Sequence, residues 1–166
     1  PVLRDILISD VEPQKQRYYD AFRLSFYLIG INLADLCTLN PDALQGGRIH
    51  YVRRKTKKEY SIRVEPEALA IIERYATPDR LARFFDGENY RAFNEKLNKA
   101  LPDDVTAYSA RHSWATVAAS LDIPDDTIAL ALGHTPRNAT TDIYIRRDLK
   151  KIDEANRKVI EKVLTG

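Results

Sequence analysis

Apolar positions recur every three or four residues along residues 13–39. In the stretch PQKQRYYDAFRLSFYLIG, Tyr18, Phe22 and Ile29 share one face of a helix, and Gly30 is expected to end that helix. The following segment, INLADLCTL, keeps this spacing and predicts a short helix, after which NPDAL is typical of a turn. This part of the chain is therefore expected to be helical, in two pieces or in one long run.

The pattern changes to a period of two after this turn. Tyr60, Ile62 and Val64 alternate with Ser61 and Arg63, as expected for a half-buried antiparallel strand. We expect GGRIHYVRRKTKKEYSIRVEP to form two strands that are joined by a polar turn around KTKK. The proline of VEP should end the second strand.

Helical patterns return after the hairpin. The expected helices are EPEALAIIERYAT, DRLARFF, NYRAFNEKLNKAL, TAYSARHSWATVAASL and DIPDDTIALALG. TPRNATTDIYIRR is expected to be a loop that leads into a helical turn. In the tail, Ile152, Ala155, Val159 and Val163 form one apolar stripe, which could pack on its own domain or on a neighbouring molecule. The prediction is one domain over residues 1–166, mainly α with a small antiparallel β-sheet (α+β).

Composition excludes several classes of protein. The hydrophobic fraction of 44% and the charged fraction of 30% are ordinary for a folded domain, and no run of apolar residues is long enough to span a membrane. The N-terminal residues lack a signal-peptide pattern. Cys37 is the only cysteine, and no Cys/His cluster has zinc-ligand spacing. We therefore expect no metal ion, no disulfide and a cytoplasmic setting.

The basic residues are concentrated in two segments, although the net charge is only +2. RIHYVRRKTKKEYSIR (48–63) contains a single acidic residue among its lysines and arginines, and IRRDLKK (145–151) is also basic. Such a distribution could form a basic face that binds DNA phosphates. From charge alone, a solvated hairpin is an equally good interpretation.

Three short motifs carry the candidate chemistry. They are ARHSWAT (110–116), ALGHT (131–135) and TTDIYIRRDL (140–149), and the tyrosine of the third motif follows the histidine of the second by ten residues. In this order, they resemble the H-x-x-R-H…L-G-H…T-x-x-Y region of the tyrosine recombinases, the phage-type integrases. YLIGINLADLCTL more loosely resembles the first box of that family, T-G-x-R-x-S-E-L. The basic hairpin falls where the family keeps its catalytic lysine.

The resemblance implies the catalytic domain of a DNA strand-exchange enzyme that needs no cofactor. Tyr144 would be the nucleophile and would form a 3′-phosphotyrosyl link. Arg111 suits the charge on the phosphoryl oxygens in the transition state, because guanidinium is a planar, permanently charged donor. His134 would bond a non-bridging oxygen or assist proton transfer. Lys55 would protonate the leaving 5′-oxygen, and the neighbouring lysines 57 and 58 are alternatives.

Further residues receive supporting or binding roles from the same resemblance. His112 would be a buried supporting residue, and Asp35, in the acidic position of the first box, would orient its neighbours. The residues expected to contact DNA phosphates are Arg53, Arg54, Lys57 and Arg137.

The sequence departs from the family pattern at two positions. Asn32 replaces the arginine of the first box, and Tyr108 replaces the first histidine of H-x-x-R. Asparagine carries no charge, so a neighbouring base such as Arg23 could supply it. Alternatively, the domain is a catalytically weak or inactive DNA-binding module. A type IB topoisomerase-like enzyme, which uses similar chemistry, is a further alternative.

Partners and context also follow from the resemblance. Double-stranded DNA is the expected partner. Such a domain is expected to belong to a site-specific recombinase that a mobile element encodes. Members of the family act as tetramers, so we expect a homo-oligomer in which the tail helix (149–164) docks on the next protomer. The chain would be the C-terminal part of a longer recombinase, without its N-terminal DNA-binding domain.

Overall fold

The computed structural model describes residues 2–85, 87–133 and 142–166, with the backbone alone described over 142–147. The helices are α1 (Val2–Ile8), α2 (Gln16–Tyr27), α3 (Leu33–Leu36), α4 (Pro66–Tyr75), α5 (Tyr90–Ala100), α6 (Ser109–Ser120), α7 (Asp125–Ala131) and α8 (Asp142–Thr165). The strands are β1 (Leu44–Gln45), β2 (Arg48–Val52) and β3 (Glu59–Arg63). The described chain is therefore mainly helical with a small antiparallel sheet, as the sequence predicts.

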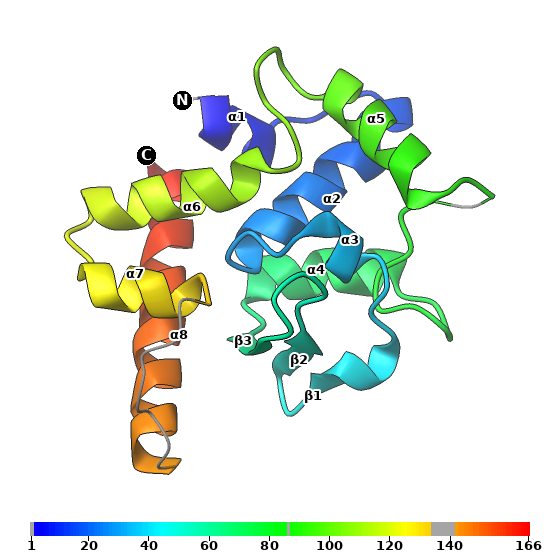
Figure 1. Cartoon of the computed structure of the whole chain (residues 1–166). Helices are drawn as coiled ribbons and strands as arrows, with labels where there is room; N and C mark the ends of the chain where they lie inside the picture. Colours follow the sequence, from blue (N-terminus) through cyan, green and yellow to red (C-terminus); the bar gives the residue numbers. More distant parts are fainter. Residues whose placement is uncertain (1, 86, 134–141) are drawn as a thin grey trace.

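Helix α2 lies at the centre of the fold (Figure 1). It contacts α1, α3, α4, α5 and α6. Phe22 and Phe26 are almost completely buried on it, and so are the small residues Ala21 and Ser25. A helix that is apolar on most of its circumference is typically surrounded by other elements. Helix α2 is therefore the core onto which α1, α3, α4, α5 and α6 pack.

The three strands form one antiparallel sheet in the order β1-β2-β3. Ile49 pairs with Ile62 and Tyr51 pairs with Tyr60, so one face of the hairpin presents these side chains to the core. The Tyr51 and Tyr60 rings stack with their centroids 4.9 Å apart. Both strands of the predicted hairpin are thus confirmed. The two-residue strand β1 was not expected, because it is too short to show a period.

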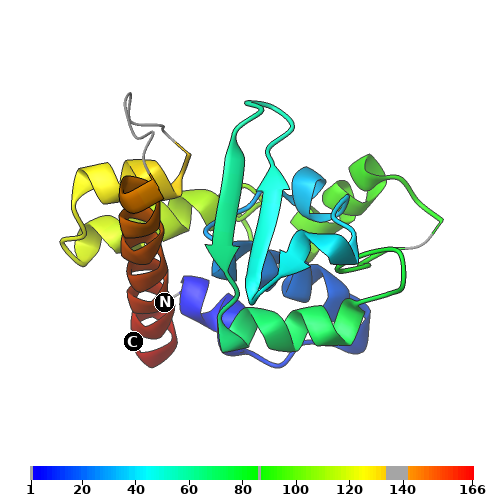
Figure 2. The same cartoon turned by 90° about the horizontal axis from the view of Figure 1, so that it is seen from below.

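Helix α8 packs on its own chain. It contacts α1, α6, α7 and β3, and Figures 1 and 2 show it lying along one side of the molecule, with the two chain ends close together. Ala155, Val159 and Val163 of the predicted stripe are buried in this contact. The structure thus shows the first of the two alternatives for the tail, in which the stripe is covered within the domain.

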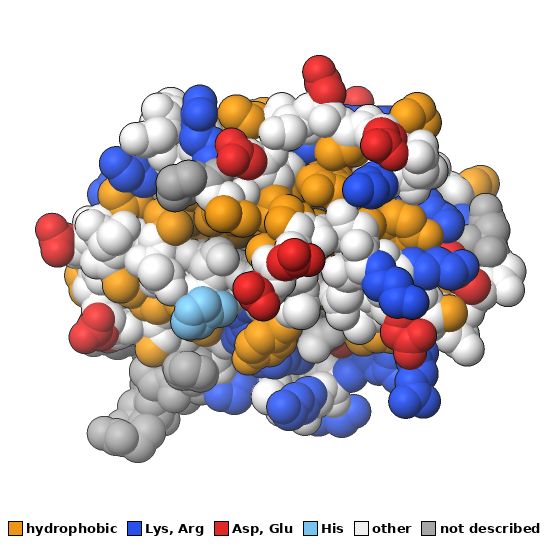
Figure 3. Space-filling view, turned by 90° about the horizontal axis from the view of Figure 1, so that it is seen from above, with side chains coloured by type: hydrophobic (Ala, Val, Ile, Leu, Met, Phe, Trp, Pro, Cys, Tyr) orange, Lys and Arg blue, Asp and Glu red, His pale blue; other side chains and the backbone are white. Residues whose placement is uncertain are grey.

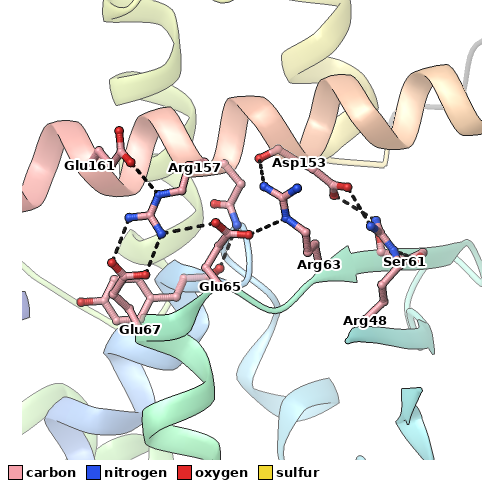
Figure 4. Close-up of polar contacts among 10 residues, drawn as sticks. Arg48, Ser61, Arg63, Glu65, Glu67, Asp153, Arg157 and Glu161 are labelled. Carbon is pink, nitrogen blue, oxygen red and sulfur yellow. Dashed lines mark hydrogen bonds and ion pairs between the residues drawn. The ribbon is translucent and has the colours of Figure 1, made fainter. Parts of the chain in front are cut away.

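A network of charged side chains also joins α8 to the sheet and to the start of α4 (Figure 4). Arg48 of β2 makes two hydrogen bonds with the carboxylate of Asp153, at 2.7 and 3.0 Å. Arg157 bonds both oxygens of Glu67 at 2.9 Å and one oxygen of Glu65 at 3.3 Å. Bidentate arginine–carboxylate pairs fix orientation as well as distance. This network therefore sets how α8 lies against the sheet.

Two hydrogen bonds in the core connect α2, α6 and α8. The indole N–H of Trp114 donates to the side-chain oxygen of Asn156 at 2.9 Å, and the amide of Asn156 donates to the main-chain oxygen of Tyr27 at 3.0 Å. Both Trp114 and Asn156 are buried. Buried polar groups are costly unless bonded, so these contacts specify a single packing of the three helices.

The structure corrects three sequence-based expectations. DRLARFF is not a helix, because its main-chain N–H groups bond other elements: that of Leu81 donates to Leu39 and that of Arg83 donates to Tyr75. This irregular segment buries Leu81, Ala82 and Phe84. Helix α1 was not expected. Helix α8 begins at Asp142, inside the segment expected to be a loop and a single helical turn.

No helix in the described ranges is long and apolar enough to cross a membrane.

Candidate active site

The turn between α2 and α3 forms one wall of the site. Gly30 has φ +71°, and its N–H donates to the oxygen of Ser25 at 2.8 Å, which ends α2 as the sequence predicts. A Cβ on Gly30 would lie 2.6 Å from Cβ of Arg111 and would overlap the backbone of that residue. The absence of a side chain therefore allows this turn to lie directly against α6.

Arg111 is positioned by the buried face of α6. Ala110, Trp114 and Ala118 recur at a spacing of four and are completely buried, which leaves Arg111 at the border between core and solvent. Its guanidinium donates to the main-chain oxygen of Leu132, at the end of α7. One bond fixes the group, and its other N–H groups, which make no hydrogen bond to the residues that the structure describes, can donate to a ligand.

The end of α7 is held by the hairpin as well as by α6. The hydroxyl of Tyr60 donates to the oxygen of Leu132 at 3.1 Å, and Nζ of Lys58 donates to the oxygen of Gly133 at 2.6 Å. Gly133 has φ +86°, and a Cβ there would overlap the Tyr60 hydroxyl. Three parts of the sequence that the motifs single out therefore meet here: the hairpin, the start of α6 and the L-G-H motif.

A pocket of about 250 Å³ opens beside Arg111. Its lining includes two arginines, three asparagines and two tyrosines: Arg53, Arg111, Asn32, Asn94, Asn98, Tyr90 and Tyr108. No aspartate or glutamate lines it among the residues that the structure describes. Two guanidinium groups without a lining carboxylate make this an anion-binding environment.

Arg53 enters the pocket from the end of β2. Its side chain is partly buried, and its Nε is a buried atom without a hydrogen-bond partner in the described structure. Burial, the Tyr60 phenol and the Asp35 carboxylate raise the pKa of the nearby Tyr51 phenol, whereas the positive charges of Arg111 and Arg53 lower it. Arg111 and Arg53 thus both lie near Tyr51, and both line the pocket.

The first-box residues are placed at the edge of this pocket. Asn32 lines it and caps α3, because its side-chain oxygen accepts a hydrogen bond from the N–H of Ala34 at 2.9 Å. Asp35 is buried and accepts a hydrogen bond from the main-chain N–H of Arg54 at 3.2 Å. The carboxylate of Asp35 thus helps to hold the start of the hairpin loop, and its orienting role in a site stays a prediction.

Arg23 does not supply the charge missing at Asn32. Its guanidinium donates to the oxygens of Ile6 and Ser9 at 2.8 and 2.6 Å and pairs with the buried carboxylate of Asp20 at 3.1 Å. These contacts join α1 to α2, and Arg23 is not among the residues that line the pocket. The hypothesis that Arg23 compensates is therefore wrong.

His112 is exposed, so the expectation of a buried histidine is also wrong. The reason is helical geometry, since Trp114 and its partners at a spacing of four occupy the buried face of α6 and turn position 112 outward. Tyr108 precedes the first turn of α6 and is 68% exposed while lining the pocket, so its hydroxyl is accessible to a ligand.

The basic residues of the hairpin separate into two groups. Arg48 and Arg63, in the strands, pair with Asp153 and Glu65 and belong to the structural network. Arg54, Lys55 and Lys57, in the turn, are exposed. The exposed positive charge is therefore concentrated at the tip of the hairpin, which Figure 2 shows projecting on the side where α8 begins.

The face that carries α1, α5 and α6 is different in character. Figure 3 shows scattered acidic and basic side chains around a band of hydrophobic ones on this face. It is therefore not the basic face that the sequence predicts.

Several predicted residues fall outside what the structure describes. His134 and Arg137 lie between the described ranges, and Tyr144 lies in the first turn of α8, where the backbone alone is described. The neighbour of His134, Gly133, is bonded to Lys58 as given above. The convergence of His134 and Tyr144 on the pocket thus stays a prediction.

The contribution of α5 was not predicted from the sequence. Tyr90, Asn94 and Asn98 recur at a spacing of four and face the pocket. Asn98 also accepts a hydrogen bond from the N–H of Ala107 at 2.9 Å and so holds the loop before α6. The sequence signal for this wall of the pocket was the spacing of four between these polar residues, which is also typical of an ordinary solvated helix face.

Within the described ranges, no group of three or more His, Cys, Asp or Glu side chains is arranged to hold a metal ion. Comparison of the chain with protein-family models and with curated proteins gave no match.

Proposed function

We propose that the domain is a site-specific DNA recombinase or integrase, which cleaves and rejoins DNA through a covalent phosphotyrosyl intermediate. The observation that carries the proposal is the pocket between α6, the α2–α3 turn and the hairpin, which Arg111 and Arg53 both line and where no described residue contributes a carboxylate. A phosphodiester in this pocket would find fixed cationic donors for its non-bridging oxygens. The motif order that resembles the tyrosine recombinases assigns the nucleophile.

The proposed step is a displacement at phosphorus. The phenol oxygen of Tyr144 forms a bond to phosphorus, and the bond from phosphorus to the 5′-oxygen breaks. The phenol gives up one proton and the leaving 5′-oxygen gains one, so no oxidant, reductant or nucleotide is consumed. Rejoining reverses both bond changes. His134 is the proposed partner for a non-bridging oxygen or for the proton, and Arg111 is held ready by its bond to Leu132.

A lysine of the hairpin is proposed to protonate the leaving oxygen. The resemblance favours Lys55, which is exposed in the turn, whereas Lys58 is the lysine whose Nζ bonds the end of α7. Lys55→Gln and Lys58→Gln, each tested on DNA with sulfur in place of the leaving 5′-oxygen, separate the two candidates. A thiolate leaves without a proton, so this DNA needs no general acid. The general acid is the lysine whose loss is rescued by sulfur.

The proposal is tested by trapping the intermediate on nicked DNA. After cleavage, the short fragment that carries the free 5′-hydroxyl diffuses away, so that rejoining is prevented. Wild-type protein should form a covalent adduct that survives denaturation, and Arg111→Gln should slow its formation by about 100-fold or more. Absence of adduct from wild-type protein, together with salt-sensitive DNA binding, would instead support the non-catalytic DNA-binding module. Relaxation of supercoiled plasmid without strand exchange would support the topoisomerase-like enzyme.

A further inference from the structure

The side chain of Asn32 leaves the pocket short of one charge. The resemblance places an arginine at this position, but the amide oxygen of Asn32 is occupied as the cap of α3. The amide nitrogen can donate a hydrogen bond and carries no charge. If two cationic groups are needed to hold a phosphodiester, the second must come from another element.

Arg53, which directly follows β2, also lines this pocket. Two main-chain hydrogen bonds across the hairpin loop hold Arg53 in place. Its N–H donates to the oxygen of Lys58, and its oxygen accepts from the N–H of Lys57, each at 2.8 Å. The side chain therefore starts from a rigid point. A positioned arginine loses less freedom on binding than one on a flexible loop.

Among the described residues that line the pocket, none is an aspartate or glutamate that could pair with the guanidinium of Arg53. Its Nε is buried and lacks a hydrogen-bond partner among the described residues. The nearby carboxylate of Asp35 is bonded to the main chain of Arg54 and does not line the pocket. A buried donor without a partner is unfavourable, and a small movement of the Arg53 side chain toward an anion in the pocket would satisfy it.

We propose that Arg53 takes the place of the missing first-box arginine and donates to a non-bridging oxygen of the phosphate that Arg111 also binds. The chain thus keeps two guanidinium clamps, with one of them moved from the α2–α3 turn to the end of β2. This inference rests on the proposed function for its catalytic meaning, whereas the anion site itself does not depend on cleavage.

The first experiment measures adduct formation on nicked DNA at saturating protein. Arg53→Gln should slow adduct formation by about 100-fold, as expected for loss of one donor to the transition state. Arg53→Lys, which keeps the charge without the planar fork, should be intermediate. The matched control is Arg91→Gln, the same change at an exposed arginine of α5 that does not line the pocket, and it should match wild type.

The second arm of this experiment returns the arginine from position 53 to position 32. In the double variant Asn32→Arg with Arg53→Gln, the guanidinium returns to the α2–α3 turn, and at least a tenfold recovery over Arg53→Gln alone is expected. Thermal unfolding of each variant shows whether loss of the Asn32 cap or of the Arg53 side chain has disturbed the fold. A variant that unfolds at the wild-type temperature and still loses the adduct supports the inference.

A second measurement keeps the inference testable without catalysis. Titration of the protein with inorganic phosphate, followed through the arginine Nε–H signals in NMR, should shift the signals of Arg53 and Arg111 together, with that of Arg91 unchanged. If wild-type protein forms an adduct and Arg53→Gln forms it equally fast, the inference is wrong and the proposed function stands. If wild-type protein forms none, the proposed function is wrong, and the titration alone decides on Arg53. A phosphate that leaves the Arg53 signal unmoved overturns the inference in either case.

Discussion

Nζ of Lys58 lies 2.6 Å from the main-chain oxygen of Gly133, 75 residues further along the chain. Together with the bonds from Tyr60 and Arg111 to Leu132, this contact fixes the end of α7 to the hairpin and to α6. The hairpin and the L-G-H motif are thus physically joined, as expected if they serve one site.

The close approach of Gly30 to Arg111 leads to a prediction on stability. Gly30→Ala should lower the free energy of unfolding by more than about 3 kcal/mol, because the methyl group both disfavours a positive φ and overlaps the α6 backbone. Gly46→Ala is the matched control. Gly46 also has a positive φ, but nothing lies within 4 Å of its Cβ position, so a loss of only about 1–2 kcal/mol is expected. Urea unfolding measures both, and equal losses would argue against the close contact.

The hydrogen bonds of Asn156 predict a second effect on stability. Asn156→Ala leaves the Trp114 N–H and the Tyr27 carbonyl buried without their partner, and should cost about 2–4 kcal/mol. Lys158→Ala, at an exposed position two residues further along α8, should change the free energy of unfolding by less than about 0.5 kcal/mol. Both values follow from chemical denaturation. A neutral Asn156→Ala would mean that α8 does not pack as described.

Helix α8 should also make stability depend on pH. Hydrogen bonds from Arg157 hold the pKa of the Glu67 carboxyl below its ordinary value of 4.5. A carboxyl with a lowered pKa in the folded state stabilises the fold above its unfolded pKa, and this contribution is lost as the pH falls through the folded value. Glu67→Gln, which cannot titrate, should therefore lose less stability than wild type between about pH 5 and pH 3. Parallel curves for the two proteins would contradict this assignment.

The hairpin tip predicts how DNA binding responds to salt. Arg54 and Lys57 are exposed, and if each contacts one phosphate, the double change to Gln should reduce the slope of log K against log salt by about 2. Lys162→Gln, near the far end of α8, is the control and should leave the slope unchanged. Fluorescence anisotropy across a salt series gives the slopes. A wild-type affinity that does not change with salt would exclude a basic binding surface.

Much of this fold follows from local sequence patterns. The period of the apolar residues predicts α2, α4, α5, α6 and α7, and the alternation around Ile62 predicts the hairpin. DRLARFF misleads because its apolar residues are buried by an irregular segment whose main chain bonds distant residues. That arrangement depends on tertiary contacts, and no local period encodes it.

The site was predictable only in part. Arg111, Tyr108, Asn32 and Arg53 were all singled out from the sequence, and the structure brings them to one pocket. The role suggested for Arg23 failed because Asp20 and the end of α1 take up its donors, which only the packing of α1 reveals. The amides of α5 were not predicted, because the other residues that line the pocket with them are distant in sequence.

The central claim is that the phenol of Tyr144 attacks a phosphate held in the Arg111 pocket. The most direct test digests the covalent adduct formed on nicked DNA and identifies by mass spectrometry which of the nine tyrosines carries the nucleotide. The account predicts a single modified peptide that contains Tyr144, and no adduct from Tyr144→Phe. A nucleotide on any other tyrosine, or an undiminished adduct from Tyr144→Phe, would contradict it.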